Sequence, residues 1–192
     1  MDVIEALRAE RPVLLPADGV YGLCALASSE TAVRALYELK GRGSSQPTQV
    51  IAASVDVLVA SIPELPRRLL DALLPGAYTL VLPNPAQRFG WVSGGRPSTI
   101  GVRVARVPHA TQAVLDAVGL VAATSANEPG DPPAATLDTV PERIRAGCGA
   151  ELDAGRLPGT PSTVVDYTGE EPRILRDGAG AIDQALAAAR LR

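Results

Sequence analysis

Aromatic residues are scarce in this 192-residue chain, which has one Trp, one Phe and four Tyr. Hydrophobic residues still make up 46% of the sequence, so the chain can bury a core of Val, Leu, Ile and Ala in a single domain over residues 1–192. Proteins that bind single-stranded RNA stack its bases on aromatic side chains, and this composition disfavours such a surface. The net charge of −3 gives the whole molecule no general attraction to polyanions.

Histidine and cysteine are also rare, with one His (His109) and two Cys (Cys24 and Cys148). A zinc site of cysteine and histidine ligands needs more of them, and the two cysteines form no C-x-x-C pair. A disulfide between them is one alternative, but free thiols in a reducing cytosol are favoured. A Ser-His-Asp triad would depend on His109 alone, and its place after Pro108 at the start of a predicted helix is typical of a surface imidazole.

The sequence contains no long hydrophobic run. The most apolar stretch, residues 69–82, is interrupted by Asp71, Pro75 and Gly76, so it is not expected to span a membrane. The first residues are acidic and lack the basic start and apolar run of a signal peptide. The phosphate-binding motif G-x-x-x-x-G-K-[ST] and the dinucleotide motif G-x-G-x-x-G are missing too. We therefore expect a cytoplasmic protein that binds nucleotides, if at all, through another architecture.

Short β-branched runs alternate with amphipathic segments along the chain, which predicts an α/β fold. The short connection at residues 167–172 favours a mixed sheet over an all-parallel one. The predicted strands are residues 13–15, 20–23, 49–53, 78–82, 99–104, 120–123, 163–166 and 173–175. The predicted helices are residues 2–10, a helix from Ser28 or Ser29 to Gly41, a short one after Ser54, and residues 64–74, 109–118, 136–146 and from 181 onward.

Several segments near the predicted strand ends combine tight-turn residues with polar side chains. They are residues 16–23, 40–43, 99–103 and 124–127, with a further pair at 162–166 and 174–178. Ligands of open α/β sheets bind at the carboxyl ends of strands, so these segments form the candidate site. One of them carries Lys40, the single lysine beside seventeen arginines. A codon bias accounts for most of that imbalance but not for the one lysine that remains.

Five motifs follow one another in a specific order, all of them within residues 16–178. K-G-R stands at 40–42, L-P-G-A-Y-T-L-V-L at 74–82, T-I-G-V-R-V at 99–104, S-A-N at 125–127 and S-T-V-V-D at 162–166. No single motif is specific, but the ordered set is. In this respect the chain resembles the YrdC-like threonylcarbamoyl-AMP synthases, which have K-G-R, W-P-G-x-x-T-L-V-L, T-V-G-V-R-V, S-x-N and S-T-V-V-D.

This resemblance implies a fold and a reaction. The fold would be a twisted open mixed α/β sheet flanked by helices around a positively lined cavity, in the single-domain form, because the chain ends before the extra C-terminal domain of some members. L-threonine, bicarbonate and ATP, with Mg²⁺, would give threonylcarbamoyl-AMP and pyrophosphate. A separate threonylcarbamoyl transferase would pass the group to tRNA. The implied partners are the three substrates, that transferase and a contact with tRNA or double-stranded RNA, and no membrane.

The resemblance also assigns roles to individual residues. Lys40 and Arg42 would be catalytic through the ATP phosphates, where a compact lysine charge and a planar arginine fork act differently. Alternatively, Lys40 and Arg42 are simply cations that stabilise the dipole at a helix C-terminus. For Arg103 the alternative is an ordinary strand residue that points to solvent. The implied ATP-binding residues are Lys40, Arg42, Thr99, Ser125, Asn127 and Arg176. The implied threonine-binding residues are Gly19, Arg103 and Ser162.

The chain departs from the family pattern mainly around the amino acid. Ala17 and Gly19 stand where the family's P-T-D-T-V-Y-G-L has hydroxyls, and Ile51 stands where many members have His. The hydroxyl missing at Gly19 is expected to bind threonine, and one such hydrogen bond contributes about 0.5–1.5 kcal/mol. Two alternatives therefore stay open: a diverged paralogue that adenylates carbamate or another carboxyl substrate, and a non-catalytic RNA-binding module.

Overall fold

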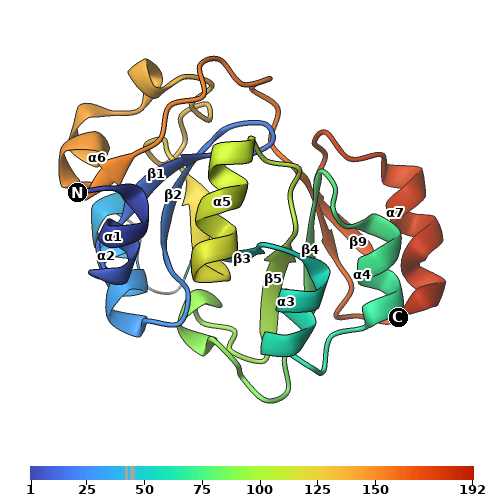
Figure 1. Ribbon diagram of the computed structural model, residues 1–192. Helices are drawn as coiled ribbons and strands as arrows, with labels where there is room; N and C mark the ends of the chain where they lie inside the picture. The colour runs from blue at the N-terminus through green and yellow to red at the C-terminus, as the bar shows by residue number, and fades with distance from the viewer. Residues whose placement is uncertain (42, 44–45) are drawn as a thin grey trace.

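The computed structural model describes residues 1–41, 43 and 46–192. In this part of the chain one nine-stranded sheet is accompanied by seven α-helices and three 3-10 turns (Figure 1). In chain order the elements are α1 (Val3–Arg8), β1 (Val13–Pro16), β2 (Tyr21–Leu26), α2 (Glu30–Lys40), β3 (Gln49–Ala52), α3 (Val55–Ser61), α4 (Arg67–Leu73), β4 (Tyr78–Pro83), η1 (Gly90–Val92), β5 (Thr99–Arg103), α5 (His109–Val118), β6 (Leu120–Ser125), η2 (Leu137–Thr139), α6 (Glu142–Gly147), β7 (Ala150–Glu151), β8 (Thr163–Asp166), β9 (Arg173–Arg176), α7 (Ile182–Ala188) and η3 (Ala189–Leu191).

The sheet is mixed, which confirms the fold class predicted from the sequence. Its strand order is β7-β1-β2-β6-β3-β5-β4-β8-β9. β2 and β6 pair antiparallel, whereas β3 and β5 are parallel neighbours, as are β4 and β8. In the register Gln49 of β3 lies between Ala123 of β6 and Gly101 of β5. Segments far apart in the sequence therefore lie next to one another across the middle of the sheet.

The helix boundaries follow from local capping chemistry. Ser29 begins α2 because its hydroxyl accepts a hydrogen bond from the Ala32 backbone N–H (3.1 Å), which is the role of an N-cap serine. Gly41 ends the helix with φ of 66°, in the left-handed region that favours glycine. Lys40 is thus held at the last turn of a helix whose ends are both fixed.

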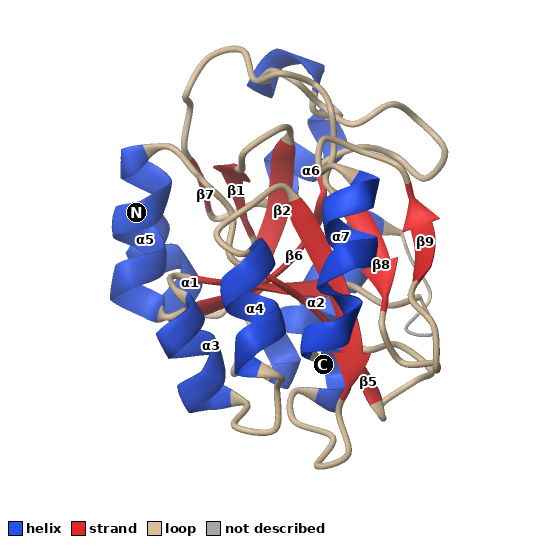
Figure 2. Cartoon of the chain, turned by 90° about the vertical axis from the view of Figure 1, so that its right-hand side faces the viewer, coloured by secondary structure: helices blue, strands red, loops and turns tan. Residues whose placement is uncertain are grey.

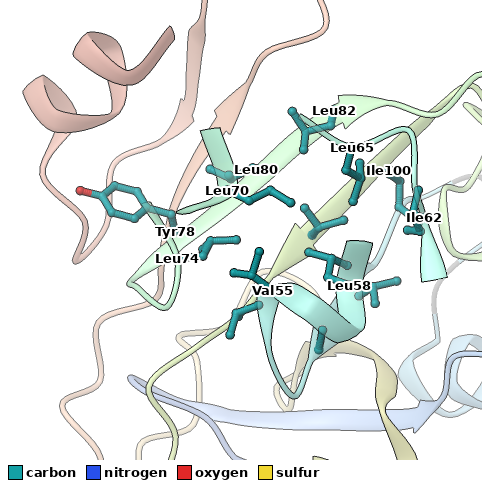
Figure 3. Packing of buried hydrophobic residues seen from close by; sticks show 14 of the residues in the cluster. Val55, Leu58, Ile62, Leu65, Leu70, Leu74, Tyr78, Leu80, Leu82 and Ile100 are labelled. Carbon is teal, nitrogen blue, oxygen red and sulfur yellow. The ribbon is translucent and has the colours of Figure 1, made fainter. Parts of the chain in front are cut away.

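One face of the sheet is covered by most of the helices. Successive strand residues point to opposite faces, and the side chains of this first face pack against α2, α3, α4, α6 and α7. α4 and α7 lie side by side over it (Figures 1 and 2). Figure 3 shows part of this core, where Leu58, Leu70, Leu80 and Ile100 meet and Tyr78 points its hydroxyl away toward the C-terminal segment.

The second face is covered over only part of its area. Leu15, Cys24, Ile51 and Val121 pack there against α1 and α5. Toward β5, β4 and β9 glycine, threonine and arginine join the apolar residues of the sheet, and they border the cavity described below. The twisted sheet therefore has a packed area and a hollow area side by side on one face.

Three expectations from the sequence differ from the structure. The helix predicted at 136–146 is broken by Pro141, so a 3-10 turn (Leu137–Thr139) and a shorter helix (Glu142–Gly147) replace it, because proline lacks an N–H for a helix interior. The helix predicted at 64–74 begins only at Arg67, after Pro66. The two-residue strand β7 was missed because so short a run has no periodicity. Among the described residues, none of the helices has the length and apolar character needed to cross a membrane.

Candidate functional site

A cavity of about 280 Å³ is formed on the second face of the sheet. Most of its strand residues recur at every second position, which is the spacing of side chains on one face; Thr124 and Leu175 are the exceptions. Gly22, Gly101 and Ala123 add little bulk, so the sheet surface is hollow there. The strand residues on this lining are Gly22, Gln49, Ile51, Thr79, Val81, Thr99, Gly101, Arg103, Ala123, Thr124, Ser125, Val164, Leu175 and Arg176.

The charged residues that line the cavity are arginines. Arg96, Arg103 and Arg176 border it, and no aspartate or glutamate does among the described lining residues. Three guanidinium groups from two strands and one connecting loop therefore face a common space. Such a lining favours an anionic ligand, because several fixed donors can share its charge.

Arg103 is the most deeply buried of the three, with 4% of its surface exposed. Its Nη2 donates to both carboxylate oxygens of Asp18, at 2.7 Å and 2.8 Å. Asp18 belongs to the turn between β1 and β2, so the turn fixes the direction of the arginine. The Nε–H of Arg103 is buried and has no hydrogen-bond partner within the described chain, which leaves one donor for a ligand.

Arg176 ends a chain of hydrogen bonds that crosses three strands. Its Nε donates to the Ser162 carbonyl (2.9 Å) and its Nη2 to the Ser162 hydroxyl (3.0 Å). The Ser162 and Thr79 hydroxyls are 2.8 Å apart, and Thr79 donates to Oε1 of Gln49 at 2.7 Å. Because the Thr79 hydroxyl has one proton and donates it to Gln49, the Ser162 hydroxyl is the donor to Thr79. The side chains of Arg176, Ser162, Thr79 and Gln49 therefore form one continuous hydrogen-bond network.

The electrostatics of Arg176 are unusual for an arginine. Partial burial of its guanidinium lowers its pKa from the ordinary value, and the positive charge of Arg103 lowers it further. The two guanidinium groups thus repel each other, and Asp18 pairs with only one of them. An anion bound between them would relieve this repulsion.

Lys40 lies behind the cavity and is completely buried. Its ammonium donates to the carbonyl of Ser125 (2.6 Å), to the carbonyl of Asn127 and to Oδ1 of Asn127 (3.0 Å). The Asn127 amide in turn donates to the carbonyls of Glu128 (3.0 Å) and Asp131 (2.6 Å). Lys40 therefore ties the end of α2 to the loop after β6, and of these residues Ser125 lines the cavity.

Gly19 is fixed by a close backbone contact. A Cβ at this position would lie 1.9 Å from the Thr160 carbonyl oxygen, and the Gly159 N–H donates to the Gly19 carbonyl at 2.8 Å. The connection between β7 and β8 thus occupies the place where a side chain would stand. A hydroxyl-bearing residue does not fit here in this conformation. Gly19 itself does not line the cavity, although its neighbour Val20 does.

The structure brings most of the predicted site residues together. Thr99, Ser125, Arg103 and Arg176 line the cavity, and Ser162 is bonded to Arg176. Lys40 and Asn127 support the loop that carries Ser125. Arg42 lies outside the described residues.

Sequence reasoning missed several residues of the site. Asp18 and Thr79 stood inside quoted motifs, but their pairing with Arg103 and Ser162 joins positions 85 and 83 residues apart, so spacing alone could not find it. Ser93 and Arg96 belong to no motif. Their signal is their place just before the strand that begins at Thr99.

The described residues offer neither a cysteine nucleophile nor a resident metal site. Complete burial raises the pKa of the Cys24 thiol to about 12, which keeps it protonated and unreactive. No group of three His, Cys, Asp or Glu side chains is placed to hold a metal ion in this part of the chain. The chemistry of the cavity is that of arginines, hydroxyls and one amide.

Comparisons with known proteins agree with this geometry. A family model described as telomere recombination (Sua5/YciO/YrdC) matches residues 5–178. A Mycobacterium tuberculosis protein provisionally named threonylcarbamoyl-AMP synthase is 36% identical over 182 residues, or 93% of this chain and 83% of the relative. An Escherichia coli threonylcarbamoyl-AMP synthase is 34% identical over 176 residues, or 87% of this chain and 90% of that protein. The structure of Pyrococcus abyssi Sua5 complexed with L-threonine superposes with a TM-score of 0.85 at 30% identity, over 96% of this chain and 55% of that one.

Proposed function

The chain belongs to the Sua5/YciO/YrdC family, and on that premise we propose that it is an L-threonylcarbamoyladenylate synthase. The reaction joins the carbon of bicarbonate to the nitrogen of L-threonine with loss of water, and an oxygen of the resulting carbamate then bonds to the α-phosphorus of ATP. Pyrophosphate leaves. The products are threonylcarbamoyl-AMP, pyrophosphate and water, so the enzyme is a nucleotidyltransferase.

The observation that carries this proposal is a pair of neighbouring guanidinium groups, buried Arg103 and more exposed Arg176, of which only Arg103 has a carboxylate partner. Threonine brings a carboxylate and the new carbamate brings a second negative charge. Arg103 binds the threonine carboxylate through its unpartnered Nε–H, and Ser162 holds Arg176 in place beside it. Arg176 then contacts the α-phosphate where the carbamate attacks, and positioning with charge stabilisation supplies the catalysis.

The proposed nucleotide contacts come from other residues. Thr99 and Ser125 line the cavity and contact the nucleotide, and Arg42 is proposed to contribute a further cation to the phosphates. Lys40 acts on these contacts through the carbonyls of Ser125 and Asn127, since its ammonium is bonded to them. In this proposal Lys40 positions the Ser125 loop.

Magnesium fits the site only as part of the substrate. Mg²⁺ prefers carboxylate, phosphate and water oxygens, and no acidic side chain lines the cavity among the described residues. We propose that Mg²⁺ enters bound to the phosphates of ATP. Its contribution there is to neutralise the charge that develops on the leaving pyrophosphate.

The wider pathway follows from the chemistry of the product. An acyl adenylate hydrolyses readily, so a threonylcarbamoyl transferase has to take it up and modify tRNA. The proposed location is the cytoplasm, where ATP, bicarbonate and tRNA meet. A direct contact of this chain with tRNA is also proposed.

A second candidate function is favoured by the residues around Arg103. Ile51 is its register partner on β3, and Ala17, Gly22 and Ala123 line the same cavity. These side chains offer no hydrogen bond to a substrate hydroxyl. The second candidate is a diverged paralogue that adenylates the carbamate of another amine or another carboxyl substrate.

One experiment separates these functions. Purified protein is given MgATP, bicarbonate and each amino acid in turn, and pyrophosphate release is measured with and without bicarbonate. Release that requires both threonine and bicarbonate supports the synthase, and release with another substrate supports the paralogue. Absence of turnover with every substrate, together with RNA binding, would show a non-catalytic module instead.

A further inference from the structure

Two residues that line the cavity have no role in the function proposed above. Ser93 and Arg96 lie on the connection between β4 and β5. Consecutive turns join them to the strand: the Arg96 N–H donates to the Ser93 carbonyl (3.2 Å), and the Thr99 N–H to the Arg96 carbonyl (3.0 Å). Because each turn spans three residues, Ser93, Arg96 and Thr99 return to the same side of the connection, and all three border the cavity.

Ser93 is a buried hydroxyl without a structural partner. Its side chain is 2% exposed, and its Oγ makes no hydrogen bond within the described chain. The surrounding backbone is firmly held, since the Val92 carbonyl accepts hydrogen bonds from the Thr48 N–H (2.8 Å) and the Tyr37 hydroxyl (3.1 Å). A buried hydroxyl in this state lowers the stability of the free protein, so its presence needs an explanation outside the fold.

Arg96 is exposed, as Arg176 is, and both line the cavity. Arg103 is paired with Asp18 and Arg176 with Ser162, whereas the Arg96 guanidinium makes no hydrogen bond or ion pair with the described residues. It stands beyond the start of β5, and Arg103 lies at the other end of that strand, about 13 Å from Thr99 at 3.3 Å per residue. A planar guanidinium beside the Ser93 hydroxyl matches the oxygens of a phosphate, whereas the Thr99 hydroxyl donates to the Arg96 carbonyl at 3.0 Å and so fixes that turn.

Resting on the proposed function, we propose that Ser93 and Arg96, next to Thr99, form a subsite for a phosphate of the nucleotide. The Ser93 hydroxyl and the Arg96 guanidinium donate to oxygens of one phosphate at the open end of the cavity. The carbamate is bound at the Arg103 end. This division would hold the nucleotide between the two ends and direct the leaving pyrophosphate toward solvent.

The test is calorimetric binding of ATP, AMP and pyrophosphate, each alone, to the full chain and to Ser93→Ala and Arg96→Ala. Each variant should weaken ATP binding by about 10-fold or more, as expected for one hydrogen bond to a charged group. If pyrophosphate binding weakens in parallel and AMP binding does not, the subsite holds the leaving phosphates. If AMP binding weakens instead, it holds the α-phosphate. Either pattern supports the subsite.

Matched variants exclude general effects. Ser98→Ala removes an exposed hydroxyl of the same connection, and Arg68→Ala removes an exposed cation on α4; both should bind ATP as the unmodified chain does. Ser93→Ala should also melt about 2–4 °C higher without nucleotide, since an unpartnered buried hydroxyl is gone.

The outcomes that overturn the proposal are distinct from failure of the proposed function. If the unmodified chain binds ATP and releases pyrophosphate but both variants bind ATP equally well, the subsite is refuted alone. If Ser93→Ala melts lower, the hydroxyl serves the fold and its ligand role is refuted. If the unmodified chain binds no ATP, the proposed function and the subsite fail together.

Discussion

Replacing Lys40 by methionine tests whether this residue organises the site through the backbone of the S-A-N loop. Lys40 is fully buried, and its ammonium donates to at least three acceptors: the Ser125 carbonyl, the Asn127 carbonyl and Oδ1 of Asn127. Methionine keeps the length and apolar stem of the side chain. It removes the charge and every donor, so the change isolates those hydrogen bonds.

The size of the effect follows from these contacts. Each hydrogen bond to a charged group contributes about 1.5–3 kcal/mol, and acceptors left without a partner keep their desolvation cost. The loop is only partly buried, so water will replace some of the lost donors. We expect a loss of about 3 kcal/mol in the free energy of unfolding, which lowers the melting temperature by about 6–12 °C in a chain of this size.

The assay is urea unfolding of Lys40→Met beside Arg68→Met, which removes an exposed cation from α4. ATP affinity should fall in Lys40→Met as well, because Ser125 loses its fixed position, and Arg68→Met should change neither quantity. A free energy of unfolding within about 0.5 kcal/mol of the unmodified chain, together with lost ATP binding, would show that Lys40 contacts the nucleotide directly and would refute this reasoning.

Three further predictions concern the turn after β1, the amino-acid end and the buried thiol. Gly19→Ala should lower the free energy of unfolding by about 1–3 kcal/mol, since its Cβ would meet the Thr160 carbonyl at 1.9 Å; a melting temperature equal to that of the unmodified chain would contradict the contact. Arg103→Met should lower kcat/KM for threonine by about 100-fold, as for a lost charge-assisted contact, and steady-state rates at varied threonine check this; an unchanged KM for threonine would place the carboxylate elsewhere. Burial raises the pKa of Cys24 from 9.0 to about 12, so the stability it contributes is complete below pH 9 and is lost as pH rises toward 12. Between pH 9 and pH 12 the free energy of unfolding should fall less in Cys24→Ala than in the unmodified chain. An equal fall with pH in the two proteins would show that this thiol is not the cause.

Helices whose boundaries are set by residues close in sequence could be predicted from the sequence. Ser29, Gly41 and the residues of His109–Val118 behave as their local chemistry requires, so the helix boundaries there were right. At residues 136–146 the apolar pattern was followed across Pro141, and the missing N–H divided the helix. Local rules failed where one residue had more weight than the pattern around it.

The candidate site was predictable in its members but not in its contacts. The resemblance selected Lys40, Ser125 and Asn127 together. Only the fold shows that the Lys40 ammonium donates hydrogen bonds to the backbone carbonyls of Ser125 and Asn127, which are 85 and 87 residues away. Gly19 was considered as a missing hydroxyl, whereas the structure shows a backbone contact with Thr160 that excludes any side chain. Such contacts depend on how distant segments meet, and spacing along the chain contains no record of them.

The central claim is that the cavity joins bicarbonate, an amino acid and AMP, and the most direct measurement is the mass of the product formed from ¹³C-bicarbonate, L-threonine and MgATP. The account predicts an adenylate that contains threonine and AMP and is heavier by one mass unit than the product from unlabelled bicarbonate. An adenylate that carries no ¹³C, or no adenylate with threonine at all, would contradict it.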